Sequence, residues 1–327
     1  MELSTKITIP KSKHPIDYHS KIMAFGSCFA QNMGAKFEYF KFHSTTNPFG
    51  IVFNPLAIEK LIHFALSKQT FSEKDIFFHN ERWHCFDAHS QLSHPDQEVF
   101  LQNLNEALHI TRNQIKESTH FILTLGTAWV YKLKKSGDIV ANCHKVPQNQ
   151  FEKLLLSVTE IEESLQQIVE KVKKTNPKIQ FIFTISPVRH LKDGFVENQR
   201  SKAHLIAAIH QYLSVTNSTL LKGGGGGEHY YFPSFEILMD ELRDYRFYAG
   251  DMLHPNQVAV NYIWERFSDS CFSETTVKIL QEVESIQNGL NHIPFNVKSE
   301  SHQKFLKTLQ EKINLLQQKI PHILFSK

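Results

Sequence analysis

Short, strongly apolar runs alternate along this chain with longer helical patterns. Three of these runs lie at residues 22–25, 121–125 and 179–185. A strand that is apolar on both faces is typical of a parallel sheet that helices cover on both sides. Crossovers between parallel strands are right-handed, so successive helices wind onto the two faces of one sheet. We therefore predict an α/β fold, a three-layer α/β/α sandwich with a parallel sheet.

Helix signals fill the segments between these runs. The first helix, at residues 28–40, has phenylalanine and methionine at helical spacing. Asn54 and Pro55 match an N-cap followed by proline at the first helical position. Further helices are predicted at residues 55–66, 96–117, 157–174, 196–213, 234–243 and 255–267. Residues 70–94 are predicted to be irregular, and a short strand is predicted at residues 230–232.

The chain divides at residue 272 in this interpretation. Residues 1–272 form the α/β domain, with an inserted hairpin at about 128–145. Residues 273–327 are polar and helical, with apolar residues recurring at helical spacing. We expect a C-terminal helical extension packed on the core, with a partner-binding arm as the alternative. The five glycines Gly223 to Gly227 predict a flexible connector.

Composition excludes several classes of protein. The net charge of the 327 residues is only +3, with no basic cluster typical of nucleic-acid binding. No run approaches the 18 apolar residues of a membrane span, and the first residues lack a secretory signal, so we expect a cytoplasmic protein. The four cysteines are widely spaced and indicate reduced thiols.

Ser27 follows the first apolar run and precedes the first helix. A backbone N–H at a helix start has no partner within the helix, and the helix dipole favours negative charge there. An oxyanion formed by attack of the Ser27 hydroxyl would meet such a donor. The simpler interpretation is that Ser27 only caps the helix.

Asp251 and His254 lie three residues apart in a loop that enters a late helix. Asp251 could accept a hydrogen bond from one imidazole nitrogen while the other faces Ser27. A serine with a base and an orienting acid is an arrangement for nucleophilic acyl chemistry. Alternatively, Asp251 only caps the following helix.

Several motifs resemble the GSCFA domain family. They are Gly26-Ser27-Cys28-Phe29-Ala30, Asn47-Pro48-Phe49-Gly50, Leu125-Gly126-Thr127, Ser186-Pro187-Val188-Arg189-His190 and Asp251-Met252-Leu253-His254-Pro255. The likeness covers roughly residues 5–270. That family resembles the SGNH/GDSL hydrolases, a flavodoxin-like superfamily of esterases, lipases and carbohydrate deacetylases. The resemblance implies Ser27 as nucleophile, His254 as base and Asp251 as the acid that orients it.

The resemblance also implies an oxyanion hole made by the Ser27 N–H, a glycine N–H and a side-chain amide. Gly50 is the candidate glycine. SGNH enzymes place Asn after a glycine at the end of a central strand, but here Thr127 follows Gly126. The Thr127 hydroxyl could donate instead, or Asn47 could supply the amide from another loop. The sequence also lacks the Asp of the Gly-Asp-Ser block.

Other residues are candidate substrate contacts. His79, His84, His89 and His94 recur every five residues, a spacing that gathers them on neither a helix face nor a strand face. We therefore expect no metal site. A loop lining a substrate cleft, with Trp83 and His84 as contacts, is the preferred interpretation.

His144, Arg189 and His190 complete the predicted contacts. Arg189 could bind a substrate carboxylate or phosphate. Equally, it could pair with a structural acid such as Asp193 or Glu197.

Together these features predict a serine hydrolase of SGNH type, an esterase or deacetylase that acts on an acylated small or carbohydrate-like substrate. No cofactor, nucleic-acid partner or membrane partner is expected, and the oligomeric state is open. An acyltransferase that uses the same triad is the close alternative. A non-catalytic carbohydrate- or metabolite-binding protein on a degenerate hydrolase scaffold is the alternative from another class.

Overall fold

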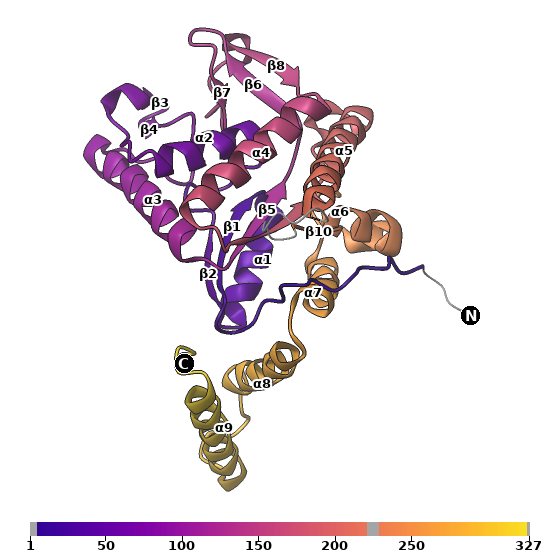
Figure 1. Ribbon diagram of the computed structural model, residues 1–327. Coiled ribbons are helices and arrows are strands. Elements are labelled where there is room, and N and C mark those ends of the chain that lie inside the picture. Colours follow the sequence, from indigo (N-terminus) through magenta and orange to yellow (C-terminus); the bar gives the residue numbers. More distant parts are fainter. Residues whose placement is uncertain (1–4, 221–228, 326–327) are drawn as a thin grey trace.

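A five-stranded parallel sheet forms the centre of the computed structural model, which describes residues 5–220 and 229–325 (Figure 1). The five-glycine run lies outside these described residues. The strand order is β10-β9-β5-β1-β2, with every neighbouring pair parallel. The strands are β1 (Lys21–Gly26), β2 (His43–Thr46), β5 (His120–Leu125), β9 (Gln180–Ile185) and β10 (Tyr230–Phe232). Ranked along the chain, this is the 2-1-3-4-5 order of flavodoxin-like doubly wound sheets.

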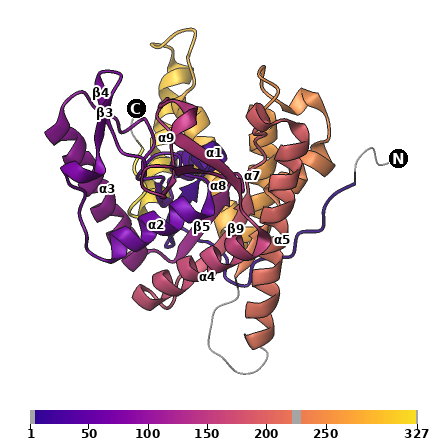
Figure 2. The ribbon, with the colours of Figure 1, turned by 90° about the horizontal axis from the view of Figure 1, so that it is seen from above.

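Two apolar cores lie on the two faces of the sheet. Alternate strand residues point to opposite faces, so Phe25 and Leu123 enter one core while Ala24 and Ile122 enter the other. The first face is covered by α2 (Pro55–Leu66), α3 (Gln97–Glu117), α4 (Val158–Thr175) and α5 (Phe195–Leu220). The second face is covered by α1 (Cys28–Tyr39) and α7 (Gln257–Cys271). Figure 2 shows α4 on one side of β5 and β9, with α1 and α7 on the other. The predicted three-layer α/β/α sandwich is confirmed.

The helices begin at the caps that the sequence indicates. Asn54 caps α2 with its side chain, and Ser157 forms a capping box with Glu160 at the start of α4. The helices of the α/β part are α1 (Cys28–Tyr39), α2 (Pro55–Leu66), α3 (Gln97–Glu117), α4 (Val158–Thr175), α5 (Phe195–Leu220), α6 (Ser234–Glu236) and α7 (Gln257–Cys271). A π-helical turn (Ile237–Leu242) continues α6, and a 3₁₀ turn (Tyr245–Phe247) follows.

Small sheets depart from the sequence-based expectation. The segment predicted to be irregular contains an antiparallel pair, β3 (Phe77–His79) and β4 (Arg82–His84). The predicted hairpin forms from β6 (Trp129–Leu133) and β7 (Ile139–Val140). A third strand, β8 (Phe151–Leu155), adds to it and was not predicted. Its sequence has too few alternating apolar residues to be recognised as a strand within the polar stretch around it.

The C-terminal helices α8 (Glu274–Leu290) and α9 (Glu300–Lys319) extend below the sheet domain in Figure 1. Their buried side chains, among them Val283 and Leu316, join the core formed by α1 and α7. The Gln287 side-chain amide also donates to the Tyr39 carbonyl at the end of α1 (2.9 Å). The amphipathic pattern of this segment therefore corresponds to burial against the α/β part.

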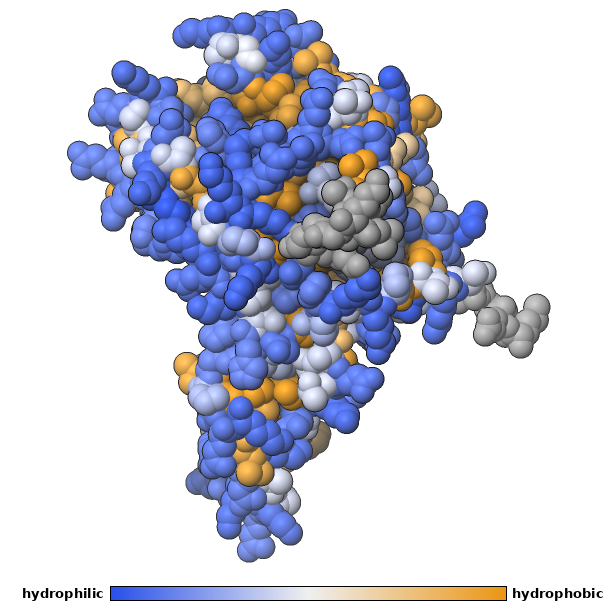
Figure 3. Space-filling model, viewed as in Figure 1, coloured by the Kyte–Doolittle hydropathy of each residue, from blue (hydrophilic) through white to orange (hydrophobic). Residues whose placement is uncertain are grey.

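The molecular face in Figure 3 is mostly hydrophilic, with apolar side chains scattered among polar ones. Within the described residues, none of the helices combines the length and the apolar character that crossing a bilayer requires.

Candidate functional site

Ser27 stands at the carboxyl end of β1, where the chain turns into α1. Its Oγ accepts a hydrogen bond from the Phe29 N–H (3.2 Å), so the side chain acts as the N-cap of the helix. Its own N–H donates to the Thr124 carbonyl (3.2 Å). The side chain is almost fully buried, with 1% of its surface exposed. The serine thus occupies the strand-to-helix turn that the sequence indicates, but beneath the surface.

Gly26 makes this turn possible. Its φ of 146° lies in a region that L side chains rarely adopt. A Cβ atom built on Gly26 would lie 2.1 Å from the Thr124 carbonyl oxygen, which is closer than atoms can approach. Because the β1 and β5 backbones need this contact, only glycine fits immediately before Ser27.

Asn47 lies beside the same turn, in the loop after β2. Its φ of 49° is left-handed, a conformation that asparagine tolerates well. Its Oδ1 accepts from the Gly26 N–H (2.8 Å), and its backbone N–H donates to the Ala24 carbonyl (2.9 Å). The other half of the amide, Nδ2, is buried without a hydrogen-bond partner. Such an unpartnered donor is unusual in a folded core.

Asp251 and His254 form a close pair. The imidazole Nδ1 lies 2.6 Å from Asp251 Oδ2, while Oδ1 accepts from the N–H groups of Leu253 and His254. These hydrogen bonds, first those from the two backbone N–H groups and then that from the imidazole, lower the pKa of Asp251 to about 2. An ionised Asp251 can only accept, so the His254 Nδ1 is the donor of this hydrogen bond, and in a neutral imidazole the lone pair is then on Nε2.

The two halves of the site differ in exposure. The side chains of His254 and Asp251 are 44% and 45% exposed, unlike that of Ser27. Among the described residues, no hydrogen bond joins Ser27 to His254. Burial above all raises the pKa of the thiol of Cys28, the residue after Ser27, and the carboxylate of Asp251 adds to that shift.

His190 connects the histidine loop with the strand ends. Burial lowers its pKa to about 3, and the charges of Lys202 and His254 add to this shift. Its Nε2 is buried without a hydrogen-bond partner, and its ring stacks on Phe53 with 5.1 Å between centroids. The neighbouring Arg189 N–H donates to the Leu253 carbonyl (3.1 Å). The segment after β9 therefore lies against the loop that carries His254.

Lys202, which the sequence analysis did not single out, is buried beneath the site. Its Nζ donates to the carbonyls of Gly126 (2.7 Å) and Ser186 (2.6 Å), the residues that follow β5 and β9. Burial lowers its pKa to about 7, and nearby Cys28 opposes that shift. Its spacing from the buried Leu205 is helical, so this apolar face of α5 was the available signal.

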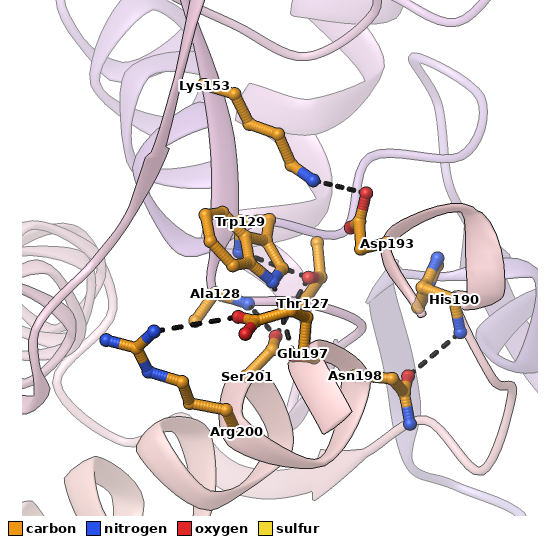
Figure 4. A network of polar contacts seen from close by, with 10 residues as sticks. All are labelled: Thr127, Ala128, Trp129, Lys153, His190, Asp193, Glu197, Asn198, Arg200 and Ser201. Atoms are coloured by element: carbon orange, nitrogen blue, oxygen red, sulfur yellow. Dashed lines mark hydrogen bonds and ion pairs between the residues drawn. The ribbon is translucent and has the colours of Figure 1, made fainter. Parts of the chain in front are cut away.

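The other predicted oxyanion donors are engaged in local structure. The Gly50 N–H donates to the Asn47 carbonyl (2.8 Å), and the Gly126 N–H donates to the Phe53 carbonyl (2.8 Å). The Thr127 hydroxyl lies 2.9 Å from the Ser201 Oγ and accepts from the Trp129 N–H (3.1 Å). Figure 4 shows Thr127 joined to Ser201 of α5. Of the predicted side-chain donors, the Asn47 amide is the one without a partner.

A cavity of about 400 Å³ opens beside His190. It lies between the β6–β7 hairpin and the turn Leu191–Asp193, which precedes α5. His144 and His190, two of the predicted substrate contacts, both line it. Burial lowers the pKa of His144 to about 4, so this ring is neutral at pH 7. Trp129 forms one wall, and Lys153 lies 4.3 Å from the centre of its ring. Aromatic faces and neutral hydrogen-bonding groups of this kind suit a polar organic ligand.

Trp83 and His84 lie on β4 and are absent from the lining of this cavity. Both nitrogens of His84 face internal partners, the Ser93 hydroxyl (2.7 Å) and the His79 carbonyl (3.0 Å). His84 instead packs behind His144, with 4.6 Å between ring centroids. Within residues 5–220 and 229–325, no group of three or more His, Cys, Asp or Glu side chains is placed to hold a metal ion.

Comparison with known proteins agrees with this arrangement of motifs. No curated protein matches the sequence significantly. Two family models do: the GSCFA family model matches residues 21–267, and the model for the C-terminal domain of GSCFA domain proteins matches residues 283–327. Since the first match alone spans most of the chain, from β1 into α7, the chain belongs to the GSCFA family.

Proposed function

We propose that this protein is a serine hydrolase of SGNH type, which removes an acyl group from a small or carbohydrate-like ester. The observation that carries the proposal is the Asp251–His254 pair, in which an ionised carboxylate holds Nδ1 at 2.6 Å and leaves Nε2 as a base. It supports the proposal because a general base needs a fixed tautomer and a fixed ring orientation.

The place of Ser27 in the fold adds support. In doubly wound sheets, ligands bind beyond the carboxyl ends of the strands, where the strand order reverses. Here that point lies between β1 and β5, and Ser27 and Thr127 follow those two strands. The unpartnered Nδ2 of Asn47 lies at the same point, through its bond with Gly26.

In the proposed reaction, the Ser27 side chain rotates away from the Phe29 N–H, and its Oγ attacks the ester carbonyl. His254 Nε2 takes the hydroxyl proton and passes it to the leaving alcohol, so that an acyl-serine remains. Water then attacks the acyl-serine, with His254 again as base, and releases the acid and the free hydroxyl. The Asn47 amide donates to the oxyanion in both steps. No cofactor is needed.

Labelling with a fluorophosphonate tests the nucleophile without knowledge of the substrate. We expect the wild-type protein to be labelled and Ser27→Ala to be unlabelled, with hydrolysis of p-nitrophenyl acetate lost in parallel. Persistence of labelling in Ser27→Ala would place the reactive nucleophile elsewhere and overturn the proposal.

One observation favours the non-catalytic alternative, a binding protein on a hydrolase scaffold. Ser27 is 1% exposed and its Oγ is engaged as a helix cap. If the wild-type protein is neither labelled nor active on p-nitrophenyl acetate, yet binds carbohydrate in calorimetry, that alternative replaces the hydrolase.

A further inference from the structure

The Arg189 guanidinium lies among aromatic rings beside the Asp251–His254 pair. Its Cζ is 4.1 Å from the centre of the Tyr248 ring, 5.2 Å from that of Tyr245 and 6.0 Å from that of Phe195. The Tyr245 and Phe195 side chains are 58% and 59% exposed, although both are large and apolar. The cation is thus held by ring faces, two of which are open to solvent.

The two acids named above as examples of a structural partner for Arg189 are engaged with other cations. Asp193 pairs with Lys153, and Glu197 lies 3.6 Å from Arg200 (Figure 4). Within the described parts of the chain, no carboxylate forms an ion pair with Arg189.

The guanidinium also has an unused donor. Its Nη1 is buried without a hydrogen-bond partner. The Tyr248 phenol forms a side-chain hydrogen bond with Arg189 and is uncharged, because burial above all raises its pKa. A buried charged donor without an acceptor is costly, so an acceptor supplied by a ligand would stabilise Nη1.

The backbone fixes Arg189 next to the histidine loop. The Arg189 N–H donates to the Leu253 carbonyl (3.1 Å), and the Ala249 N–H donates to the His254 carbonyl (2.7 Å). Tyr248, on which the guanidinium stacks, pairs with Pro255 in a β-bridge. Both the main chain of Arg189 and its stacking partner are therefore bonded to the residues that flank His254.

We propose that Arg189 binds an anionic group of the substrate, so that the ester hydrolysed at Ser27 carries a carboxylate or a phosphate. A planar guanidinium presents paired N–H groups that match the oxygens of either anion. Tyr245 and Phe195 cover the ring or chain that joins this anion to the ester. The naming of the ester rests on the proposed function, whereas the binding of the anion does not.

A substrate comparison tests the proposal. We measure kcat/KM for phenyl acetate, which is neutral, and for 4-acetoxybenzoate, 4-acetoxyphenyl phosphate and monophenyl succinate, which carry the anion on the alcohol or the acyl side. The wild-type protein should prefer at least one anionic ester. Arg189→Met should reduce that preference by about 10- to 100-fold, the range for losing a hydrogen-bonded charge.

Arg200→Met is the matched control, because Arg200 is exposed and its guanidinium already faces Glu197. It should keep the wild-type preference. A wild-type protein without any preference for an anionic ester, or a preference unchanged in Arg189→Met, overturns the proposal. If Arg189→Met does not fold, Arg189→Lys replaces it and should lose a smaller part of the preference, since it keeps the charge but not the paired donors.

Direct binding separates this inference from the proposed function. Benzoate and phenyl phosphate are titrated into Ser27→Ala and into Ser27→Ala with Arg189→Met, by calorimetry. Binding that weakens at least ~10-fold in the double variant supports the anion site even if no esterase activity is found. Equal affinities, or the absence of binding to both proteins, overturn it.

Discussion

The serine half and the histidine half of the candidate site are built differently. Around Ser27, the backbone is hydrogen-bonded to the buried strand β5, and the turn requires a glycine that packs directly on Thr124. Around His254, the Asp251–His254 pair is about half exposed. It lies in a loop in which Asp251 accepts hydrogen bonds from the N–H groups of Leu253 and His254. The difference teaches that the Ser27 side contributes to fold stability as well as to the proposed chemistry, whereas the His254 side contributes to the proposed chemistry alone. Changes on the first side should damage the fold, and changes on the second should damage chemistry alone.

The largest expected effect is on the histidine side. His254→Ala should lower kcat for p-nitrophenyl acetate by roughly 10⁴- to 10⁶-fold, since the base and the nucleophile act as a unit. Its free energy of unfolding should change by less than about 0.5 kcal/mol, because the side chain is exposed. Kinetic assays and urea unfolding of the same preparation measure both. A decrease in the free energy of unfolding as large as that of a core variant would contradict the difference between the two halves.

The Asn47 amide contributes both to the fold, through Oδ1, and to the proposed chemistry, through Nδ2. Asn47→Asp keeps an acceptor for the Gly26 N–H and a residue that tolerates the left-handed backbone, but it removes the Nδ2 donor. We expect kcat to fall by about 10²- to 10³-fold, as for the loss of one oxyanion donor. Asn47→Ala removes the acceptor as well and should also unfold more easily. Wild-type kcat in Asn47→Asp would exclude this amide from the oxyanion hole.

A pair of glycine variants compares the two halves directly. Gly26→Ala should lower the free energy of unfolding by about 3 kcal/mol or more, because the backbone is strained and the new Cβ meets the Thr124 carbonyl. Gly250→Ala, next to Asp251, should change it little, since its Cβ would meet no atom within 4 Å. Similar losses in the two variants, measured by urea unfolding, would contradict the division.

The smallest effect is expected at His144, which lines the cavity beside His190. Burial lowers its folded pKa to about 4, so between pH 6.5 and 4 the unfolded chain binds the extra proton. Its contribution to stability is complete above pH 6.5 and is lost as the pH falls, by up to about 1.4 kcal/mol per pH unit. His144→Gln should therefore show a shallower acid-side decline than the wild-type protein in urea unfolding at pH 7, 5.5 and 4.5. Parallel curves would mean that His144 titrates normally.

Burial explains which parts of the fold the sequence predicts. Strands β1, β5 and β9 are buried on both faces, so their apolar runs and the caps of the following helices mark them well. Strand β2, of sequence His-Ser-Thr-Thr, lies at the sheet edge with no apolar run and was missed. Its existence depends on pairing with β1, which is a tertiary contact and leaves no local pattern.

The same limit applies to the candidate site: contacts within one loop can be predicted from the sequence, and contacts between distant elements cannot. The close spacing of Asp251 and His254 predicts their contact, because it needs only a local loop. The burial of Ser27 was not predictable, since it depends on how β5 and the loop after β2 pack around the turn. Likewise, the pairing of Asp193 with Lys153 joins residues from separate elements, so the sequence left the partner of Arg189 open.

Lys202 has a consequence for how the site responds to its surroundings. Its amine has a pKa of about 7 and bridges two carbonyls, Gly126 O and Ser186 O. A neutral amine still has two N–H groups, which is enough for both bonds. Near pH 7 the ends of β5 and β9 can thus remain hydrogen-bonded to Lys202 in either protonation state. The positive potential of Lys202 at Cys28 and His190 increases when the amine is protonated and decreases when it is not. The ends of the two strands would then keep their positions while the pH of the medium changes the electrostatic potential at Cys28 and His190.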